Sequence, residues 1–231
     1  MRSEFTLKTA DGQTLVAELA LPAHSEPVAT LICLHPLPTH GGFMDSHVLR
    51  KAANRLPYLA NIAVLRFNTR GTESPQGKSS GDFDEGHLER LDLEAAVDFA
   101  VGKKMPNRWL LGWSFGTELA LKYGWNQDIT GAILLSPPLH RTSQAELERW
   151  NHVDKRVVAL IPEFDSYLTP QQAAPAFAIM SKYEQIDVAD AKHLWVGEPY
   201  VHRVLDEVVR LVSPNAYPLP TQIDSHIVVR D

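Results

Sequence analysis

A serine flanked by glycines is the feature of the sequence with the clearest chemical potential. Gly112, Ser114 and Gly116 form a G-x-S-x-G pattern that follows an apolar run and opens an amphipathic segment. This context predicts a strand, a sharp turn and a helix, in which the turn exposes a serine hydroxyl as a nucleophile. The glycines let the strand and the helix approach closely, and the helix N-terminus favours negative charge nearby. The alternative is a glycine-rich turn whose serine only caps the helix.

A serine hydroxyl is a weak nucleophile, so a base must take its proton and an acid must orient that base. The sequence supplies such residues in the order Ser, Asp, His. Asp165 comes just after one apolar run, and His193 follows the next apolar run along the chain. Glu163 is a rival for the role of the acid. The arrangement predicts Ser114, Asp165 and His193 as the catalytic residues.

The loop at residues 35–42 is expected to stabilise the negative charge that develops on a substrate. An oxyanion needs hydrogen-bond donors, and the N–H of Phe115, directly after the serine, supplies one. Prolines have no N–H to give, which leaves Leu37 as the best second donor in this loop. His35 is expected to brace the loop through hydrogen bonds and to take no part in the chemistry.

Histidines in and near this loop raise the question of a metal site. His35, His40 and His47 lie close to Asp45 in the sequence, but their spacing matches no recognised zinc pattern. Scattered residues of these types near a reactive serine more often act as polar supports. No metal site is predicted.

Two arginines follow a predicted strand on the side of the sheet where the serine is expected. Arg66 and Arg70, in the segment RFNTRGTESPQG, could meet an anionic substrate. The simpler interpretation is that they pair with the acidic segment 81–94, GDFDEGHLERLDLE. That segment is expected to form a loop and the start of a helix, where carboxylates suit the helix dipole. Its side chains are expected to be solvated and not to bind calcium.

The composition fits one folded domain with room for a hydrophobic core. The chain has 231 residues, of which 44% are hydrophobic and 22% charged, and its net charge of -6 disfavours nucleic acid and anionic membranes as partners. Cys33 lies alone in an apolar run, and no stretch resembles a signal peptide or a membrane span, so a cytoplasmic location is expected. We expect a single domain over 1–231, with a core at about 4–212 and a proline-containing tail at 213–231.

The elements that must position the candidate residues alternate along the chain. Two segments around Asp11 and Gly12 predict an N-terminal β-hairpin. Six later apolar runs are too short for helices and suit strands of a parallel sheet that is covered on both faces. These runs are 28–34, 62–67, 108–113, 131–135, 156–161 and 185–188.

Helical spacing occurs between these runs. Ser143 with Glu146 predicts a capping box that opens a short helix, and Pro170 suits the first turn of another. Three sets of apolar residues predict amphipathic helices: Met44, Val48, Ala52 and Leu56; Leu88, Leu91, Ala95 and Phe99; and Val201, Val204, Leu205, Val208 and Val212. The alternation predicts an α/β fold, with a mostly parallel sheet, an N-terminal antiparallel hairpin and helices on both faces.

Several motifs in this order resemble the α/β-hydrolase superfamily. They are the hairpin, the segments HPLPTHGG, RFNTRG and GWSFG, then Asp165 and His193, and the resemblance covers roughly residues 4–212. Within the superfamily the chain is similar to small bacterial serine hydrolases without a cap, which have an HPHP-type oxyanion loop and an RFN-x-RG turn. Leu37 stands where the second histidine of that loop is expected, and GTESPQG is more compact than the usual glycine-rich turn.

The resemblance implies an enzyme that cleaves a small carboxylic ester through an acyl-enzyme intermediate, without a cofactor. Its partner would be a small-molecule acyl substrate. Three alternatives stay open: transfer of the acyl group to an acceptor other than water, cleavage of a thioester, and a non-catalytic binding module with this fold.

The same resemblance predicts an open pocket. Many members carry a lid after the strand that follows the serine, and the stretch 136–155 leaves room only for one short helix there. The residues expected to contact substrate are Trp113, Leu139, His140, Tyr167 and Trp195.

Overall fold

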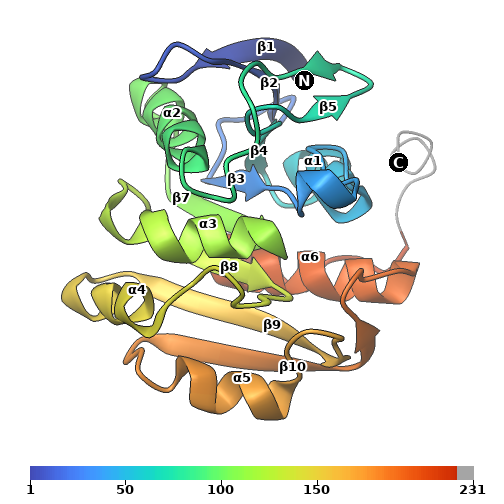
Figure 1. Ribbon diagram of the computed structural model, residues 1–231. Coiled ribbons are helices and arrows are strands. Elements are labelled where there is room, and N and C mark those ends of the chain that lie inside the picture. Colours follow the sequence, from blue (N-terminus) through green and yellow to red (C-terminus); the bar gives the residue numbers. More distant parts are fainter. Residues whose placement is uncertain (223–231) are drawn as a thin grey trace.

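The computed structural model describes residues 1–222, so the predicted tail 213–231 lies outside the described residues from position 223 on. Its main sheet has eight strands in the order β1-β2-β4-β3-β7-β8-β9-β10 (Figure 1). The strands are β1 (Arg2–Lys8), β2 (Thr14–Ala20), β3 (Ala29–Leu34), β4 (Ile62–Phe67), β7 (Arg108–Trp113), β8 (Gly131–Leu135), β9 (Arg156–Phe164) and β10 (Tyr183–Lys192). A separate small sheet pairs β5 (Glu73–Ser74) with β6 (Gly77–Lys78).

Strand directions follow the predicted pattern. β2 pairs antiparallel with β1 and with β4, whereas β3, β4, β7, β8, β9 and β10 pair in parallel. The predicted hairpin is confirmed, with a turn at residues 9–13 in which Gly12 has a φ of 86°. That backbone conformation is easy for glycine and rare for other residues.

Helices cover both faces of the sheet, as predicted. α1 (His47–Leu59) and α6 (Glu198–Val212) share one core cluster with the sheet, and α2 (Glu89–Gly102), α3 (Phe115–Tyr123), α4 (Gln144–Glu148) and α5 (Pro170–Phe177) share the other. The part of the chain that the structure describes also has four short 3-10 helices: η1 (Pro38–His40), η2 (Gly124–Asn126), η3 (Arg149–His152) and η4 (Pro214–Ala216). The predicted capping box at Ser143 and Glu146 opens α4, and Pro170 begins α5.

The central strands are buried throughout, which explains their continuous apolar character. Every residue of β3, β4 and β8 is buried. The expectation of cover on both faces is wrong for β10, whose residues are mostly half-buried or exposed. Within residues 1–222, β10 is the last strand of the sheet and pairs with β9 alone, and most of its residues are half-buried or exposed.

The predicted buried face of α2 is also corrected. Leu88, at the start of that face, is 43% exposed, and Leu91, Ala95 and Phe99 are only half-buried. The residues that α2 buries are Glu89, Asp92, Leu93, Ala96, Val97 and Ala100. Two carboxylates therefore lie on the inner face, contrary to the expectation that the acidic segment is solvated.

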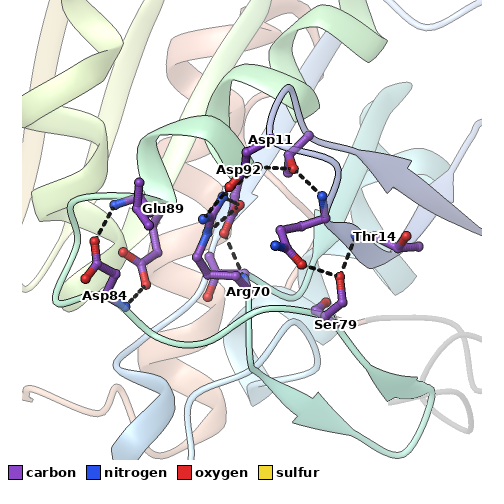
Figure 2. A network of polar contacts seen from close by, with 12 residues as sticks. Asp11, Thr14, Arg70, Ser79, Asp84, Glu89 and Asp92 are labelled. Atoms are coloured by element: carbon purple, nitrogen blue, oxygen red, sulfur yellow. Dashed lines mark hydrogen bonds and ion pairs between the residues drawn. The ribbon is translucent and has the colours of Figure 1, made fainter.

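Hydrogen bonds explain why the two carboxylates can be buried. Glu89 accepts from the backbone N–H groups of Asp84 and Gly86, at 2.8 and 2.9 Å. Asp92 accepts from the backbone N–H of Arg70 and from its guanidinium, at 2.7 to 3.0 Å, and Arg70 also pairs with Asp11 of the hairpin turn (Figure 2). A buried charge is tolerated when it is paired and hydrogen-bonded in this way.

Both arginines of the RFNTRG segment are thus committed to structural ion pairs. Arg70 pairs with the acidic segment as expected, but Arg66 pairs instead with Glu18 and Asp45. The side chains of Arg66 and Arg70 are 0% and 2% exposed, so neither is free to meet an anionic substrate.

Candidate active site

The three residues predicted as catalytic come together at the carboxyl edge of the sheet. Ser114 directly follows β7, Asp165 directly follows β9, and His193 directly follows β10. Because these strands are parallel, their carboxyl ends lie along the same edge. Residues that are far apart in the sequence are brought into contact by this topology.

The turn at Ser114 has the geometry that its two glycines allow. Ser114 has φ 51° and ψ -116°, an uncommon conformation for a serine, and its N–H donates to Leu135 O at 2.9 Å. A Cβ atom at Gly112 would lie 2.5 Å from Gly116 O, and one at Gly116 would lie 2.1 Å from Leu34 O. Only glycine lets α3 approach β7 and β3 this closely.

The side chains form a continuous hydrogen-bonded series. His193 Nδ1 lies 2.9 Å from Asp165 Oδ2, and His193 Nε2 lies 2.9 Å from Ser114 Oγ. An ionised carboxylate only accepts, so Nδ1 carries the proton and the serine hydroxyl donates to Nε2. The base is held in the tautomer that can take a proton from the serine.

The charge on Asp165 is stabilised by its surroundings. Burial opposes ionisation, but hydrogen bonds from His193 and from the N–H groups of Tyr167 and Leu168 outweigh it, and the pKa of Asp165 lies below its usual range. The rival acid, Glu163, is exposed and accepts the N–H of Asp190 at 2.9 Å. Asp165 therefore contacts the histidine, and Glu163 does not.

The two residues proposed to supply backbone donors for an oxyanion belong to the wall of one cavity. Leu37 and Phe115 both line it together with Ser114. Within residues 1–222, the N–H groups of Leu37 and Phe115 donate to no backbone carbonyl in the turns, loops and helix caps. Phe115 is the first residue of α3, where an N–H has no partner within the helix. Both groups are available to a bound ligand.

His35 braces the loop that carries Leu37, as predicted. Its Nδ1–H donates to Pro36 O at 2.7 Å, and its Nε2 accepts the N–H of Thr69 at 3.1 Å. Burial lowers the pKa of His35 to about 4, against the effect of the bond to Pro36. The ring is therefore neutral and joins the loop to the turn after β4.

A cavity of about 330 Å³ opens beside the serine hydroxyl. Its lining residues are Pro36, Leu37, His40, Ser114, Phe115, Glu118, Pro138, His140, Arg141, Tyr167, His193 and Leu194. His140 and Tyr167 were predicted to contact substrate, and they are part of this wall. The segment between β8 and β9 forms α4 and, directly after it, the 3-10 helix η3, where the sequence predicts one short helix in place of a lid.

The predictions for Trp113, Leu139 and Trp195 are corrected, because none of these residues lines the cavity. Trp113 and Trp195 are 3% and 0% exposed and pack in the cluster between the sheet, α1 and α6. Leu139 packs against the opposite cluster. Because both tryptophans lie close to catalytic residues in the sequence, they suggest a binding surface. In the structure both are part of the hydrophobic core.

Several residues of the cavity wall were not predicted from the sequence, among them Pro138, Glu118, Arg141 and Leu194. Glu118 lies one helical turn after the serine, a spacing that could have placed it on the same face. Its carboxylate accepts from the backbone N–H of Arg141 and lies 3.4 Å from the Arg141 guanidinium. Burial raises the pKa of Glu118, against the effect of Arg141. Leu194 is 57% exposed beside the base, and no local signal marks Arg141.

Two other findings concern residues 1–222 as a whole. They contain no group of three or more His, Cys, Asp or Glu side chains arranged to hold a metal ion. None of the helices in this part of the chain combines the length and the apolar character that a bilayer crossing demands.

No family model matches the chain, and no curated protein matches it. Several solved structures do. An α/β serine hydrolase without a lid from Xanthomonas campestris is 25% identical, with a TM-score of 0.72 over 96% of this chain and 97% of that one. A serine hydrolase homologue from Coxiella burnetii is 26% identical, with a TM-score of 0.74 over 92% and 96%. An esterase from Pyrococcus furiosus is 18% identical, with a TM-score of 0.72 over 92% and 91%.

The narrower resemblance, to hydrolases with an HPHP-type loop and an RFN-x-RG turn, stays a prediction. The mostly parallel sheet with its N-terminal antiparallel hairpin belongs to a fold that superposes on these structures over more than nine-tenths of the chain. The chain has the α/β-hydrolase fold without a lid, and its similarity to serine hydrolases supports a hydrolase.

Proposed function

We propose that this chain is a serine hydrolase that cleaves a small carboxylic ester through an acyl-enzyme intermediate. The observation that carries the proposal is the hydrogen-bonded series from Ser114 through His193 to Asp165. Leu37 and Phe115, whose N–H groups are the proposed oxyanion donors, line the same cavity as Ser114 and His193. A nucleophile, a base and an orienting acid within hydrogen-bond reach are the parts that acyl transfer needs.

In the first half of the reaction, Ser114 Oγ attacks the ester carbonyl carbon while its proton passes to His193 Nε2. The carbonyl oxygen becomes an oxyanion and accepts the N–H groups of Phe115 and Leu37, which contribute about 2.7 to 4 kcal/mol each in comparable sites. The tetrahedral intermediate then collapses, the bond to the alcohol oxygen breaks, and His193 gives the proton to that oxygen. The acyl group remains on Ser114.

In the second half, water attacks the acyl carbon and His193 takes its proton. Collapse returns the proton to Ser114 Oγ and releases the carboxylic acid, so atoms and charge balance over the cycle. Asp165 stays ionised in every step, which its lowered pKa favours, and stabilises the imidazolium that forms twice. Proton transfer of this kind contributes about 10²- to 10⁴-fold.

The cavity supports a small substrate with an apolar part. A volume of about 330 Å³ lies at the lower end of the range for ligand pockets. Leu37, Phe115, Pro138, Tyr167 and Leu194 supply apolar wall. We propose that Tyr167 and His140 contact the substrate, because both line the cavity. The ring of Tyr167 meets the rings of His140 and His193, with centroid distances of 5.3 and 4.6 Å.

Hydrolysis of p-nitrophenyl acetate and butyrate tests the proposal. Ser114→Ala and His193→Ala should each lower kcat/KM by at least about 10³-fold, because the residues act as one unit. Ser143→Ala is the matched control, since Ser143 is an exposed serine that caps α4 and does not line the cavity. Its activity should remain. Wild-type kcat/KM in Ser114→Ala would contradict the proposal.

A further inference from the structure

The carbonyl oxygen of His193 is held by two buried side chains. Trp113 Nε1–H and Ser136 Oγ–H both donate to it, each at 3.2 Å. Trp113 is 3% and Ser136 1% exposed, so water does not compete for these bonds. Trp113 is the last residue of β7, directly before Ser114, and Ser136 directly follows β8.

The residues that follow His193 in the loop after β10 are also held by hydrogen bonds. His47 Nε2–H donates to Leu194 O at 2.8 Å, and the imidazole of His47 meets the indole of Trp113 edge to face at 5.2 Å. Trp195, fully buried, takes a positive φ of 52°, and its N–H donates to Lys192 O at 2.9 Å. The carbonyls of two successive residues are thereby bonded, and a buried indole anchors the loop beyond them.

Resting on the proposed function, we propose that Trp113 and Ser136 are positioning residues that fix the base of the hydrolase through its backbone carbonyl. The residue directly before the nucleophile thus holds the base. This contact ties the distance between Ser114 Oγ and His193 Nε2 to the ends of β7 and β8, which are buried strands. A displacement of about 1 Å in such a site can cost 10²-fold in rate.

The backbone at Ser136 fits this role. Ser136 has a positive φ of 52°, which serine rarely adopts, and its N–H donates to Leu160 O at 3.1 Å. Strained backbone of this kind persists where the surrounding structure holds it in place, and it clusters at functional sites. In this chain, the strained residue is Ser136, whose hydroxyl donates to the carbonyl of His193.

Removal of each donor tests the proposal. Trp113→Phe keeps an aromatic ring but removes the N–H, and Ser136→Ala removes the hydroxyl. Because neither residue lines the cavity, kcat for p-nitrophenyl butyrate should fall while KM stays within about twofold, as for an interaction that acts on the transition state alone. The loss should reach about 10- to 100-fold in Trp113→Phe. The double variant should lose more than the product of the two single losses, because each single variant retains one donor.

Trp109→Phe is the matched control. Trp109 lies on the same strand and is 2% exposed, but its Nε1–H donates to Asn107 Oδ1 at the opposite end of β7. Its variant should lose stability in a similar way and keep kcat. The low-field proton signal of His193 Nδ1–H, which reports the bond to Asp165, should broaden in Trp113→Phe and Ser136→Ala and remain sharp in Trp109→Phe.

The outcomes separate this inference from the proposed function. If Ser114→Ala is inactive while Trp113→Phe and Ser136→Ala keep kcat and the His193 signal, the positioning role is wrong and the hydrolase proposal stands. If Ser114→Ala hydrolyses the ester at the wild-type rate, both fail. If Trp113→Phe does not fold, Ser136→Ala decides alone: a lower kcat with unchanged KM supports the role, and an unchanged kcat overturns it.

Discussion

His35 must remain neutral because both of its ring nitrogens are engaged in fixed roles. Nδ1 donates to Pro36 O and Nε2 accepts from the backbone N–H of Thr69. A proton on Nε2 would turn an accepting atom into a second donor that faces a donor. Burial, which disfavours the charged form, lowers the pKa of His35 to about 4. The conformation of the loop at residues 35–42 depends on this uncharged form.

This residue makes the stability of the fold depend on pH. The unfolded chain binds the His35 proton near pH 6.5 and the folded chain only near pH 4, so the free energy of unfolding is greatest above 6.5 and decreases as pH falls through this window. The full contribution is about 3 kcal/mol. In His35→Gln, urea unfolding at a series of pH values should show a shallower decrease between pH 6.5 and 4. Equal slopes in the two proteins would contradict the assignment.

The residue types in the sequence identify the candidate catalytic residues but not the residues that line the substrate cavity. Ser114, Asp165 and His193 are recognisable because their roles demand particular groups in a particular order. No residue order in the sequence marks the places of Trp113 and Trp195. An indole serves equally well in a core and at a binding surface, and only the packing against α1 and α6 shows which applies.

At the scale of elements, the site depends on how closely α3 approaches the sheet. A Cβ at Gly116 would lie 2.1 Å from Leu34 O, a backbone atom that cannot move aside without displacing β3. Gly116→Ala should therefore reduce the free energy of unfolding by about 3 kcal/mol or more through overpacking. The midpoint of urea unfolding measures this loss.

Gly102→Ala supplies the comparison. Gly102 is the last residue of α2, and an added Cβ there has no neighbour within 4 Å. Alanine should leave stability unchanged or raise it by up to about 1 kcal/mol, because it loses less backbone entropy than glycine. If Gly116→Ala were as stable as Gly102→Ala, the close approach of α3 and β3 would not hold.

Elements with one clear physical cause could be predicted from the sequence. The buried strands are continuous apolar runs, and α4 begins at a capping box. The inner face of α2 could not be predicted, because Glu89 and Asp92 are buried through bonds to Arg70 and to the backbone N–H groups of Asp84 and Gly86, which are distant in the sequence or in a loop. Hydrophobic periodicity registers the apolar stripe and not such tertiary partners.

At the scale of the whole molecule, the parallel sheet brings the residues of the candidate active site together. Each strand from β7 to β10 is directly followed by a residue in or beside the site: Ser114, Ser136, Asp165 and His193. The ion pairs of Arg70, which lies in the turn after β4, connect that turn to the hairpin turn and to α2 (Figure 2). His35 links that turn to the oxyanion loop. The whole fold therefore holds the site in place.

Covalent labelling with a fluorophosphonate probe tests the central claim most directly. An activated serine attacks the phosphorus and releases fluoride, so the adduct reports nucleophilicity without any assumption about the natural substrate. Intact mass and peptide mapping should show one adduct, on Ser114, that is absent in Ser114→Ala and forms much more slowly in His193→Ala. An adduct at another residue with Ser114 unmodified, or equal labelling of Ser114→Ala, would contradict the account.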